Sequence, residues 1–281
     1  MEEVVAIEDD GLITPEIGSW GEEKYRHVAL YSSLFAKSMR RKWECLVYID
    51  LFSGAGRSRI RGTKRIVNSS PLVVLGLHDK FDRYIFCEKE HQKSEALKNR
   101  IKREFPDADF YVVEGDANQR VAEILAKMPD FRKDFHVLAF CFADPYALSN
   151  LNFETIRKLS TRYMDFLVLI PSGMDAQRFA EKYVKELDSP VDLFLGSSKW
   201  RPAWKEAQKD KTPFEQFIVK AFGQSMESLD YIDPGIELAV PIRSDEKNLL
   251  LYRLVLYSRH VLGKEFWRQA KKYSQAQQEM F

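Results

Sequence analysis

A glycine-rich turn after an apolar segment is the first part of this sequence with a ligand-binding pattern. The run Tyr48-Ile49-Asp50-Leu51-Phe52-Ser53-Gly54-Ala55-Gly56 ends in small residues, and glycine lets the backbone approach a ligand closely. A phosphate-binding loop would need Gly-Lys-Ser/Thr. The dinucleotide motif of an NAD-linked dehydrogenase would need a third glycine, where this chain has Arg59. The turn therefore favours a ligand that lacks a pyrophosphate.

S-adenosylmethionine (SAM) fits this pattern, because it has no pyrophosphate to bind. Its sulfonium and α-amino groups are positively charged, so a carboxylate such as that of Asp50 would be a suitable neighbour. The sequence predicts SAM contacts from the residues of the turn, namely Asp50, Phe52, Ser53, Gly54 and Gly56.

Two further carboxylates follow the next two apolar segments. Glu88 ends Ile85-Phe86-Cys87-Glu88, where an acid can accept hydrogen bonds from both ribose hydroxyls, and Lys89 comes next. Asp116 follows Val113-Glu114-Gly115, where it can accept from the adenine amino group beside the backbone of Ala117. The alternatives are a solvated acid at Glu88 and a helix cap at Asp116. The order of turn, acid and acid after successive strands predicts a SAM site.

The segment Ala143-Asp144-Pro145-Tyr146 follows the fourth apolar run, where the methyl group should meet its acceptor. Asp144 could accept a hydrogen bond from a nucleophile or deprotonate it, beside the cofactor, and Tyr146 could stack on a planar acceptor or contact the sulfonium. Adenine and cytosine amino-methyltransferases carry Asp/Asn-Pro-Pro-Tyr/Phe here, whereas this chain has one proline. We expect Asp144, Pro145 and Tyr146 to form the catalytic segment; a type I turn containing proline is the alternative.

Alternating strands and helices are predicted to position these groups. Five such β–α units in series predict a doubly wound Rossmann-like α/β sheet with helices on both faces. The expected strands are 45–51, 84–87, 110–113, 136–143 and 165–170, and the expected helices are 20–42, 71–77, 91–104, 118–127 and 153–160.

The pattern changes after residue 170. Residues 174–235 are predicted to be a helical insertion, in which 179–187 and 214–222 are helices and 200–204 is a loop or a helix start. Residues 236–242 and 249–257 predict an antiparallel hairpin that completes a seven-stranded methyltransferase sheet, and 264–275 a final helix. We therefore expect a single methyltransferase-like domain over 1–281, with 1–43 as an N-terminal extension and helix.

Composition limits the partners of the chain. The 43 basic and 42 acidic residues give a net charge of +1, so no global field favours nucleic acid. The three cysteines are scattered and predict reduced core thiols and no metal site. No signal peptide or membrane span is predicted, so we expect a soluble, cytoplasmic protein. A local basic run beside the turn could bind the phosphates of RNA or DNA, or could be a solvated loop; it comprises Arg57, Arg59, Arg61, Lys64 and Arg65.

With these motifs in place, the chain resembles the three-Cys-motif partner family, a branch of the class I SAM-dependent methyltransferases. The resemblance implies a methyltransferase fold and a functional link to a protein with a three-cysteine motif that looks like a radical SAM enzyme; it implies no particular substrate. It rests on the glycine-rich turn, Lys24-Tyr25-Arg26-His27, Ser70-Pro71-Leu72, Asp144-Pro145-Tyr146 and Tyr257-Ser258-Arg259-His260-x-x-Gly263.

Two functions follow as hypotheses. The first is a SAM-dependent methyltransferase acting on a nucleic-acid base, with the helical insertion as a lid. The second is a non-catalytic partner subunit that binds SAM or RNA through the same fold. His27 could face the substrate, or be a satisfied, half-buried histidine. Trp200 and Trp204 could stack on bases, or pack the insertion on the sheet.

Overall fold

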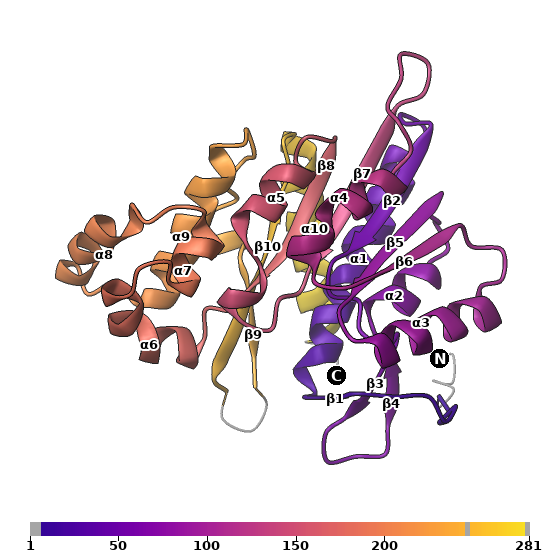
Figure 1. Cartoon of the computed structure of the whole chain (residues 1–281), viewed down its shortest axis with the longest axis horizontal. Helices are drawn as coiled ribbons and strands as arrows, with labels where there is room; N and C mark the ends of the chain where they lie inside the picture. The colour runs from indigo at the N-terminus through magenta and orange to yellow at the C-terminus, as the bar shows by residue number, and fades with distance from the viewer. Residues whose placement is uncertain (1–6, 245–247, 279–281) are drawn as a thin grey trace.

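A seven-stranded sheet forms the centre of the computed structural model, which describes residues 7–244 and 248–278 (Figure 1). The strand order is β6-β5-β2-β7-β8-β10-β9. The pairs among β6, β5, β2, β7 and β8 are parallel, and β10 is antiparallel to both β8 and β9. The predicted Rossmann-like methyltransferase sheet with a C-terminal hairpin is confirmed. The strands are β2 (Cys45–Asp50), β5 (Arg83–Glu88), β6 (Phe110–Glu114), β7 (Val137–Ala143), β8 (Met164–Ile170), β9 (Val240–Arg243) and β10 (Leu250–Tyr257).

Strand β2 is buried along its whole length and separates two hydrophobic cores. Leu46 and Tyr48 pack into one core, and Val47 and Ile49 into the other. This alternation is typical of a parallel strand that is covered on both faces. Helices α1 (Trp20–Met39), α2 (Ser70–Leu75), α3 (His91–Glu104) and α10 (Val261–Gln278) contribute to the first core, and α4 (Ala117–Lys127) and α5 (Phe153–Leu159) to the second.

The chain reverses its strand order at β2. It runs from β2 outward to β5 and β6, and then returns to β7 on the other side of β2. Asp50 at the end of β2 lies in register with Phe86 of β5 and Phe142 of β7. The connections after β2 and β7 leave in opposite directions, and ligands of open α/β sheets bind in the crevice between such connections. This topology brings the ends of the four motif-bearing strands together.

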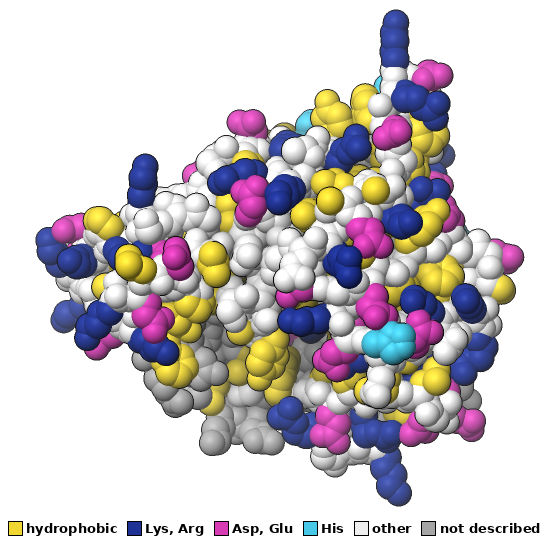
Figure 2. All heavy atoms as spheres, in the orientation of Figure 1, with side chains coloured by type: hydrophobic (Ala, Val, Ile, Leu, Met, Phe, Trp, Pro, Cys, Tyr) yellow, Lys and Arg dark blue, Asp and Glu magenta, His cyan; other side chains and the backbone are white. Residues whose placement is uncertain are grey.

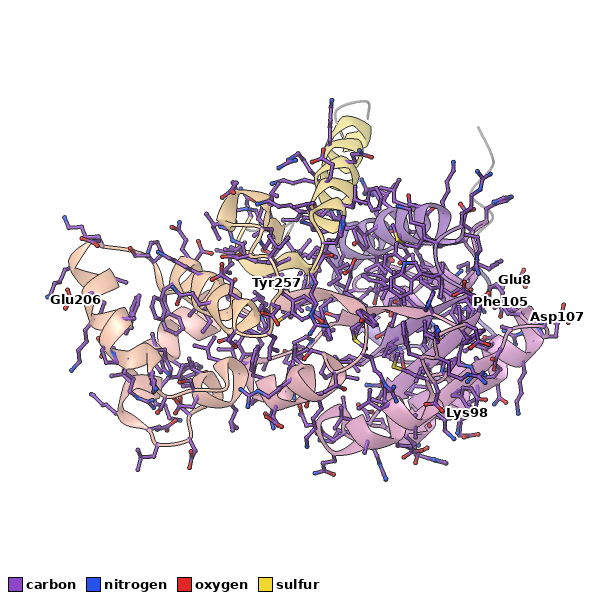
Figure 3. The ribbon with its side chains drawn as sticks, turned by 90° about the horizontal axis from the view of Figure 1, so that it is seen from above. Glu8, Lys98, Phe105, Asp107, Glu206 and Tyr257 are labelled. Atoms are coloured by element: carbon purple, nitrogen blue, oxygen red, sulfur yellow. The ribbon has the colours of Figure 1, made fainter. Side chains whose placement is uncertain are left out.

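Four helices form the insertion between β8 and β9, at the left of Figure 1. Figure 3 shows the same lobe from above, with Glu206 near its tip and Phe105 and Asp107 at the opposite end of the molecule. The insertion packs on α5, because the Phe222 ring stacks on Phe194 and meets Phe153 edge-on. The helices are α6 (Met174–Lys185), α7 (Pro190–Leu195), α8 (Trp200–Lys209) and α9 (Phe214–Glu227).

The insertion adds one helix to those expected and decides between two alternatives at 200–204, where a helix starts. Helix α7 was not predicted, although Ser189 and Asp192 form a capping box and Pro190 begins the first turn. Trp200 and Trp204 begin a full helix and are only 5% and 6% exposed. They pack against Phe214 and Phe217 of α9 within the insertion, so neither ring is an open stacking surface for bases.

The basic segment after the glycine-rich turn is a β-hairpin, not the loop that its charge suggested. Strands β3 (Arg57–Ile60) and β4 (Ile66–Asn68) pair antiparallel, and β1 (Glu16–Ile17) pairs parallel with β3. The side chains of Ser58 and Ile60 are buried and alternate with half-buried arginines. Strands β1, β3 and β4 form a second, three-stranded sheet, which lies along one side of the crevice.

The C-terminal hairpin begins later than expected. Ile236–Leu238 forms the 3₁₀ helix η2, whose amide groups are bonded locally, from Leu238 N–H to Gly235 O and from Ala239 N–H to Ile236 O. The first arm of the hairpin therefore starts at Val240. Among the described residues, no helix combines the length and apolar character needed to cross a membrane.

The side chain of Phe222 contributes to the packing between the insertion and the rest of the protein. It is fully buried among the rings of Phe153, Phe194 and Tyr257. We expect Phe222→Ala to lower the free energy of unfolding by about 3–5 kcal/mol, because it removes buried apolar surface and leaves a cavity. Urea denaturation measures this change. Phe179→Ala, at a ring that is 41% exposed, serves as the control and should cost less than about 1 kcal/mol.

Candidate functional site

The glycine-rich turn has the backbone conformation that its residues predict. Gly54 and Gly56 have φ values of +63° and +83°, which residues with a side chain rarely adopt. Ser53 is nearly fully buried and anchors the turn to β5, because its N–H and its hydroxyl both donate to the Cys87 carbonyl at 3.0 Å. Phe52, which precedes Ser53, is partly buried and lines the cavity described below.

Glu88 lies at the end of β5 and joins the second motif to the first. One carboxylate oxygen accepts the Gly54 N–H at 2.8 Å, and the other accepts the Glu90 N–H at 2.8 Å. The side chain is only slightly exposed. Each carboxylate oxygen can accept a second hydrogen bond, so this position suits the ribose role expected from the sequence.

Asp116 is the N-cap of α4, as the alternative interpretation proposed. Its Oδ1 accepts hydrogen bonds from the backbone and the side chain of Asn118, both at 3.0 Å. Its Oδ2 lies 3.3 Å from the largely exposed Lys89 ammonium. Ala117 is buried in the first turn of the helix. Capping uses one carboxylate oxygen and leaves the other directed toward the surface beside β5.

Asp50 lies beneath the turn and does not line the cavity below, in contrast to the expectation that it would neighbour the cofactor's charged groups. Its carboxylate is fully buried and accepts the Phe52 N–H at 3.1 Å. Burial raises the pKa of Asp50 to about 7, although hydrogen bonds from Ser70 and from the Phe52 amide lower it. Its contacts hold the shape of the turn.

A cavity of about 250 Å³ lies between the turn and helix α1. Asp144, at the end of β7, lines it together with Phe52, Gly54, Lys24 and Tyr25. The Lys24 ammonium lies 2.5 Å from Asp144 Oδ2, and the two side chains are 11% and 15% exposed. Burial lowers the pKa of Lys24, but the charge of Asp144 and the hydrogen bond between them outweigh it and raise the pKa above its usual range.

A second cavity, of about 330 Å³, adjoins the first. The two share Trp20, Arg61, Tyr146 and Tyr252 as lining residues. Tyr146 is 85% exposed, whereas Pro145 beneath it is buried. The insertion contributes only Tyr183 to this wall among the described residues. The paired cavities form one cleft, with the glycine-rich turn at one end and aromatic rings at the other.

Most of the predicted phosphate-binding run is engaged within the protein. The guanidinium of Arg61 instead lies over the Trp20 ring, 6.0 Å from its centroid, and among the described residues neither Arg61 nor Lys64 forms an ion pair. Figure 2 shows basic and acidic side chains intermixed over the visible face. The ion pairs of the run are Arg57 with Asp10 and Glu104, Arg59 with Asp9, and Arg65 with Glu22.

Several residues of the cleft were not predicted as site residues from their own pattern. Lys24 entered only through the family resemblance, and Trp20 and Tyr252 were assigned to structural elements alone. His27, one turn after Lys24, packs against Trp267 in the core and is 2% exposed. Burial lowers its pKa to about 4.

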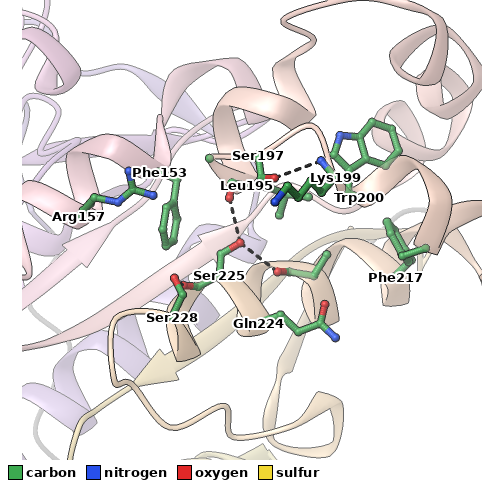
Figure 4. Close-up of a pocket in the computed structure, with 13 residues that line it drawn as sticks. Phe153, Arg157, Leu195, Ser197, Lys199, Trp200, Phe217, Gln224, Ser225 and Ser228 are labelled. Carbon is green, nitrogen blue, oxygen red and sulfur yellow. Dashed lines mark hydrogen bonds between the residues drawn. The ribbon is translucent and has the colours of Figure 1, made fainter.

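Two other groupings lie outside this cleft. Figure 4 shows a cavity of about 310 Å³ bounded by α5 and the insertion, in which the Ser225 hydroxyl donates to the Leu195 and Ala221 carbonyls. Trp200 lines it, but none of the residues predicted to bind SAM or to form the catalytic segment does. Side-chain ligand atoms of His91, Glu95 and Glu114 lie within 4.8 Å of one another, but Glu95 is paired with Lys98, and Glu114 with His91 and Ser94.

Comparisons with known proteins concern the fold alone. Trm1 from Pyrococcus horikoshii with S-adenosyl-L-methionine is 12% identical to this chain, with a TM-score of 0.46. The alignment covers 94% of this chain and 64% of the Trm1 chain. The O-methyltransferase from Bacillus cereus in complex with SAH is 11% identical, with coverages of 90% and 92% and a TM-score of 0.47. A putative RNA methyltransferase from Pyrococcus horikoshii is 12% identical, with coverages of 88% and 93% and a TM-score of 0.40.

A scan against protein-family models finds no match, and a search of curated proteins finds none either. The fold assignment therefore rests on the strand order and directions of the sheet.

Asp50 should make stability depend on pH. Its pKa is raised to about 7 in the folded chain, so the folded state binds a proton more tightly than the unfolded state, and the free energy of unfolding should fall between about pH 4 and pH 7. Asp50→Asn should flatten this decline in urea denaturation measured across the range. Asp165→Asn should flatten the decline as well, because burial raises the pKa of Asp165 to about 6. Glu95→Gln is the control, because the hydrogen bond with Lys98 lowers the pKa of that carboxylate. An unchanged slope between pH 6 and pH 7 in Asp50→Asn would contradict the assignment.

Proposed function

We propose that this protein is a SAM-dependent methyltransferase whose acceptor is a base of RNA or DNA. The observation that carries the proposal is that Asp144, at the end of β7, lines the same cavity as the glycine-rich turn after β2. This is the switch point of the sheet, where open α/β folds bind nucleotide-like ligands.

The nucleoside half of SAM would lie over the ends of β5 and β6. Glu88 supports this placement, since it is tied to Gly54 and retains acceptor capacity for the ribose hydroxyls. At the adenine edge, Asp116 would accept a hydrogen bond and the backbone of Ala117 would donate one. Lys89 would have to move from Asp116, and its exposure leaves it room to do so.

The aromatic cavity supports a planar acceptor. Tyr146 presents an exposed ring beside Asp144, and Trp20 and Tyr252 line the same space. Bases stack favourably on such rings, by about 1–3 kcal/mol each. Arg61 lines this cavity, and neither it nor Lys64 forms an ion pair among the described residues, so both side chains are available to contact phosphates. A base turned out of its stack would reach Asp144 through it.

Asp144 is suited to orient an amino or hydroxyl acceptor. Its Oδ2 is held by Lys24, and its Oδ1 makes no hydrogen bond within the described part of the chain. That oxygen can accept a hydrogen bond from an acceptor N–H and so direct the nitrogen lone pair toward the cleft. SAM, when bound, supplies the electrophilic methyl group. Holding the two reactants in line is expected to provide most of the acceleration.

The resemblance to the three-Cys-motif partner family supports a further part of the proposal. We propose that the protein acts in the cytoplasm together with a three-Cys-motif protein. The alternative is a non-catalytic subunit that binds SAM or RNA. Two observations favour that alternative: Lys24 occupies one oxygen of Asp144, and most of the basic run is engaged in ion pairs.

Calorimetry with SAM and with its demethylated product SAH tests whether the cleft binds the cofactor. We expect both to bind, and we expect Glu88→Gln to weaken both by about tenfold or more, because hydrogen bonds to a charged group contribute about 1.5–3 kcal/mol. Glu90→Gln is the matched control, since this neighbouring carboxylate is largely exposed and paired with Lys93.

Transfer of labelled methyl groups from SAM to total RNA and DNA then separates the two functions. Binding of neither ligand would contradict the proposal, and binding of both without transfer would favour the non-catalytic subunit.

Variants of Tyr146 test the proposed binding of the acceptor. Tyr146→Ala should reduce methyl transfer by roughly fivefold to a hundredfold, because a stacking surface of about 1–3 kcal/mol is lost, while SAM affinity changes little. Tyr146→Phe keeps the ring and should retain transfer. Equal activity in the Ala variant and the unchanged protein would remove Tyr146 from the acceptor site.

A further inference from the structure

The ion pair between Lys24 and Asp144 places two opposite charges at the centre of the cleft. Lys24 comes from α1, before the first strand of the large sheet, and Asp144 follows β7, 120 residues later. Their ionised groups are 2.5 Å apart and nearly enclosed, at 11% and 15% exposure. The Lys24 ammonium also lies 4.8 Å from the centre of the Tyr25 ring. The pair carries no net charge, but each partner alone would impose a full charge on the cavity.

The other charged side chains that line the cavity are placed differently. Lys93 is bound to Glu90 at 2.5 Å, and Arg61 lies over Trp20. Glu16 belongs to β1 and is exposed. Because Lys24 and Asp144 are the charges held at close range in the enclosed part, their balance dominates the field that a ligand between the turn and Asp144 would experience.

This balance matters for a reaction in which a cation loses its charge. SAM carries a positive sulfur, and the sulfur becomes neutral in SAH as the methyl group leaves. A bare carboxylate beside the sulfur would stabilise the reactant more than the transition state, and interactions that favour the ground state slow a reaction. An ammonium held against that carboxylate cancels this effect.

We propose that Lys24 is a positioning residue that neutralises Asp144, so that the site binds SAM and SAH without electrostatic preference for the charged sulfur. The same contact fixes Asp144 through Oδ2 and leaves Oδ1 open to the acceptor. This inference rests on the proposed function, since it assumes that the cavity beside Asp144 receives the sulfur of SAM.

The ratio of the SAM and SAH dissociation constants tests this role without requiring the acceptor. Calorimetry on Lys24→Met should show a preference for SAM over SAH that is greater than that of the unchanged protein by about tenfold or more, because the carboxylate is left unpaired. Asp144→Asn leaves the ammonium unpaired, so the ratio should shift by a similar factor in the opposite direction. The double variant should return to the original ratio, and Lys24→Arg should keep it.

A matched ion pair elsewhere provides the control. Arg253 and Glu215 lie 3.0 Å apart, with side chains 15% and 13% exposed, and Arg253→Met should leave the ratio unchanged. Thermal denaturation with and without SAH establishes that each variant is folded; if Lys24→Met is not, Asp144→Asn and Lys24→Gln carry the test.

The outcomes separate the two claims. If the unchanged protein binds both ligands and neither single substitution moves the ratio by more than twofold, the role of Lys24 is overturned while the proposed function stands. If it binds neither ligand, the proposed function fails, and this inference fails with it.

Discussion

The burial of β2 between two parallel neighbours is the constraint on which the rest of the structure depends. Its side chains fill two cores at once, through Tyr48 on one face and Ile49 on the other. Since β5 and β7 both pair with β2 in parallel, the chain must leave its carboxyl end in one direction and return from the other. The crevice that results is filled by the turn after β2, and Glu88 and Asp144 reach it from the flanking strands. The strand order therefore brings these polar groups together at one point of the sheet edge.

The N-terminal segment completes the cleft, and a buried ion network holds it in place. Asp10 accepts hydrogen bonds from Arg100 and Arg103 of α3, and it also pairs with Arg57 of β3. Arg100 is fully buried, and its guanidinium also donates to the Ala55 carbonyl in the glycine-rich turn. These contacts position β1 and the start of α1, and with them Lys24. Removing one partner of a buried pair costs several kcal/mol because the other charge is left uncompensated, so the placement of this segment is sensitive to the loss of Asp10 or Arg100.

Much of the fold could be predicted from the sequence, because the strands and helices of the five β–α units are encoded locally. The predicted helix 91–104 is α3 in full, and the strand predicted at 136–143 is β7 apart from its first residue. The glycines of the turn were also recognisable, since positive φ restricts the residue type. The rest depends on long-range contacts. Nothing near Asp144 signals Lys24, and nothing near Arg57 signals Asp10, because the partners come together only in the folded chain.

The same limit explains Asp50. Its type and place at the end of a strand resembled those of a ligand-contacting acid, but the hydrogen bonds that enclose it come from Ser70 and from the backbone of Phe52. A carboxylate that shapes a turn and one that faces a ligand have the same local sequence.

The aromatic cavity has a consequence for how proteins of this architecture can diverge. Beside Tyr146 after β7, its walls include Trp20 in α1, Arg61 in the β3–β4 turn, Tyr183 in α6 and Tyr252 in β10. These four residues lie outside the β2, β5 and β6 units. Substitutions at these four positions can reshape the entrance while the parallel strands of the sheet stay intact. Under the proposed function, selectivity toward the acceptor could thus evolve independently of cofactor binding, and a change of substrate would leave little trace in the motifs by which the fold is recognised.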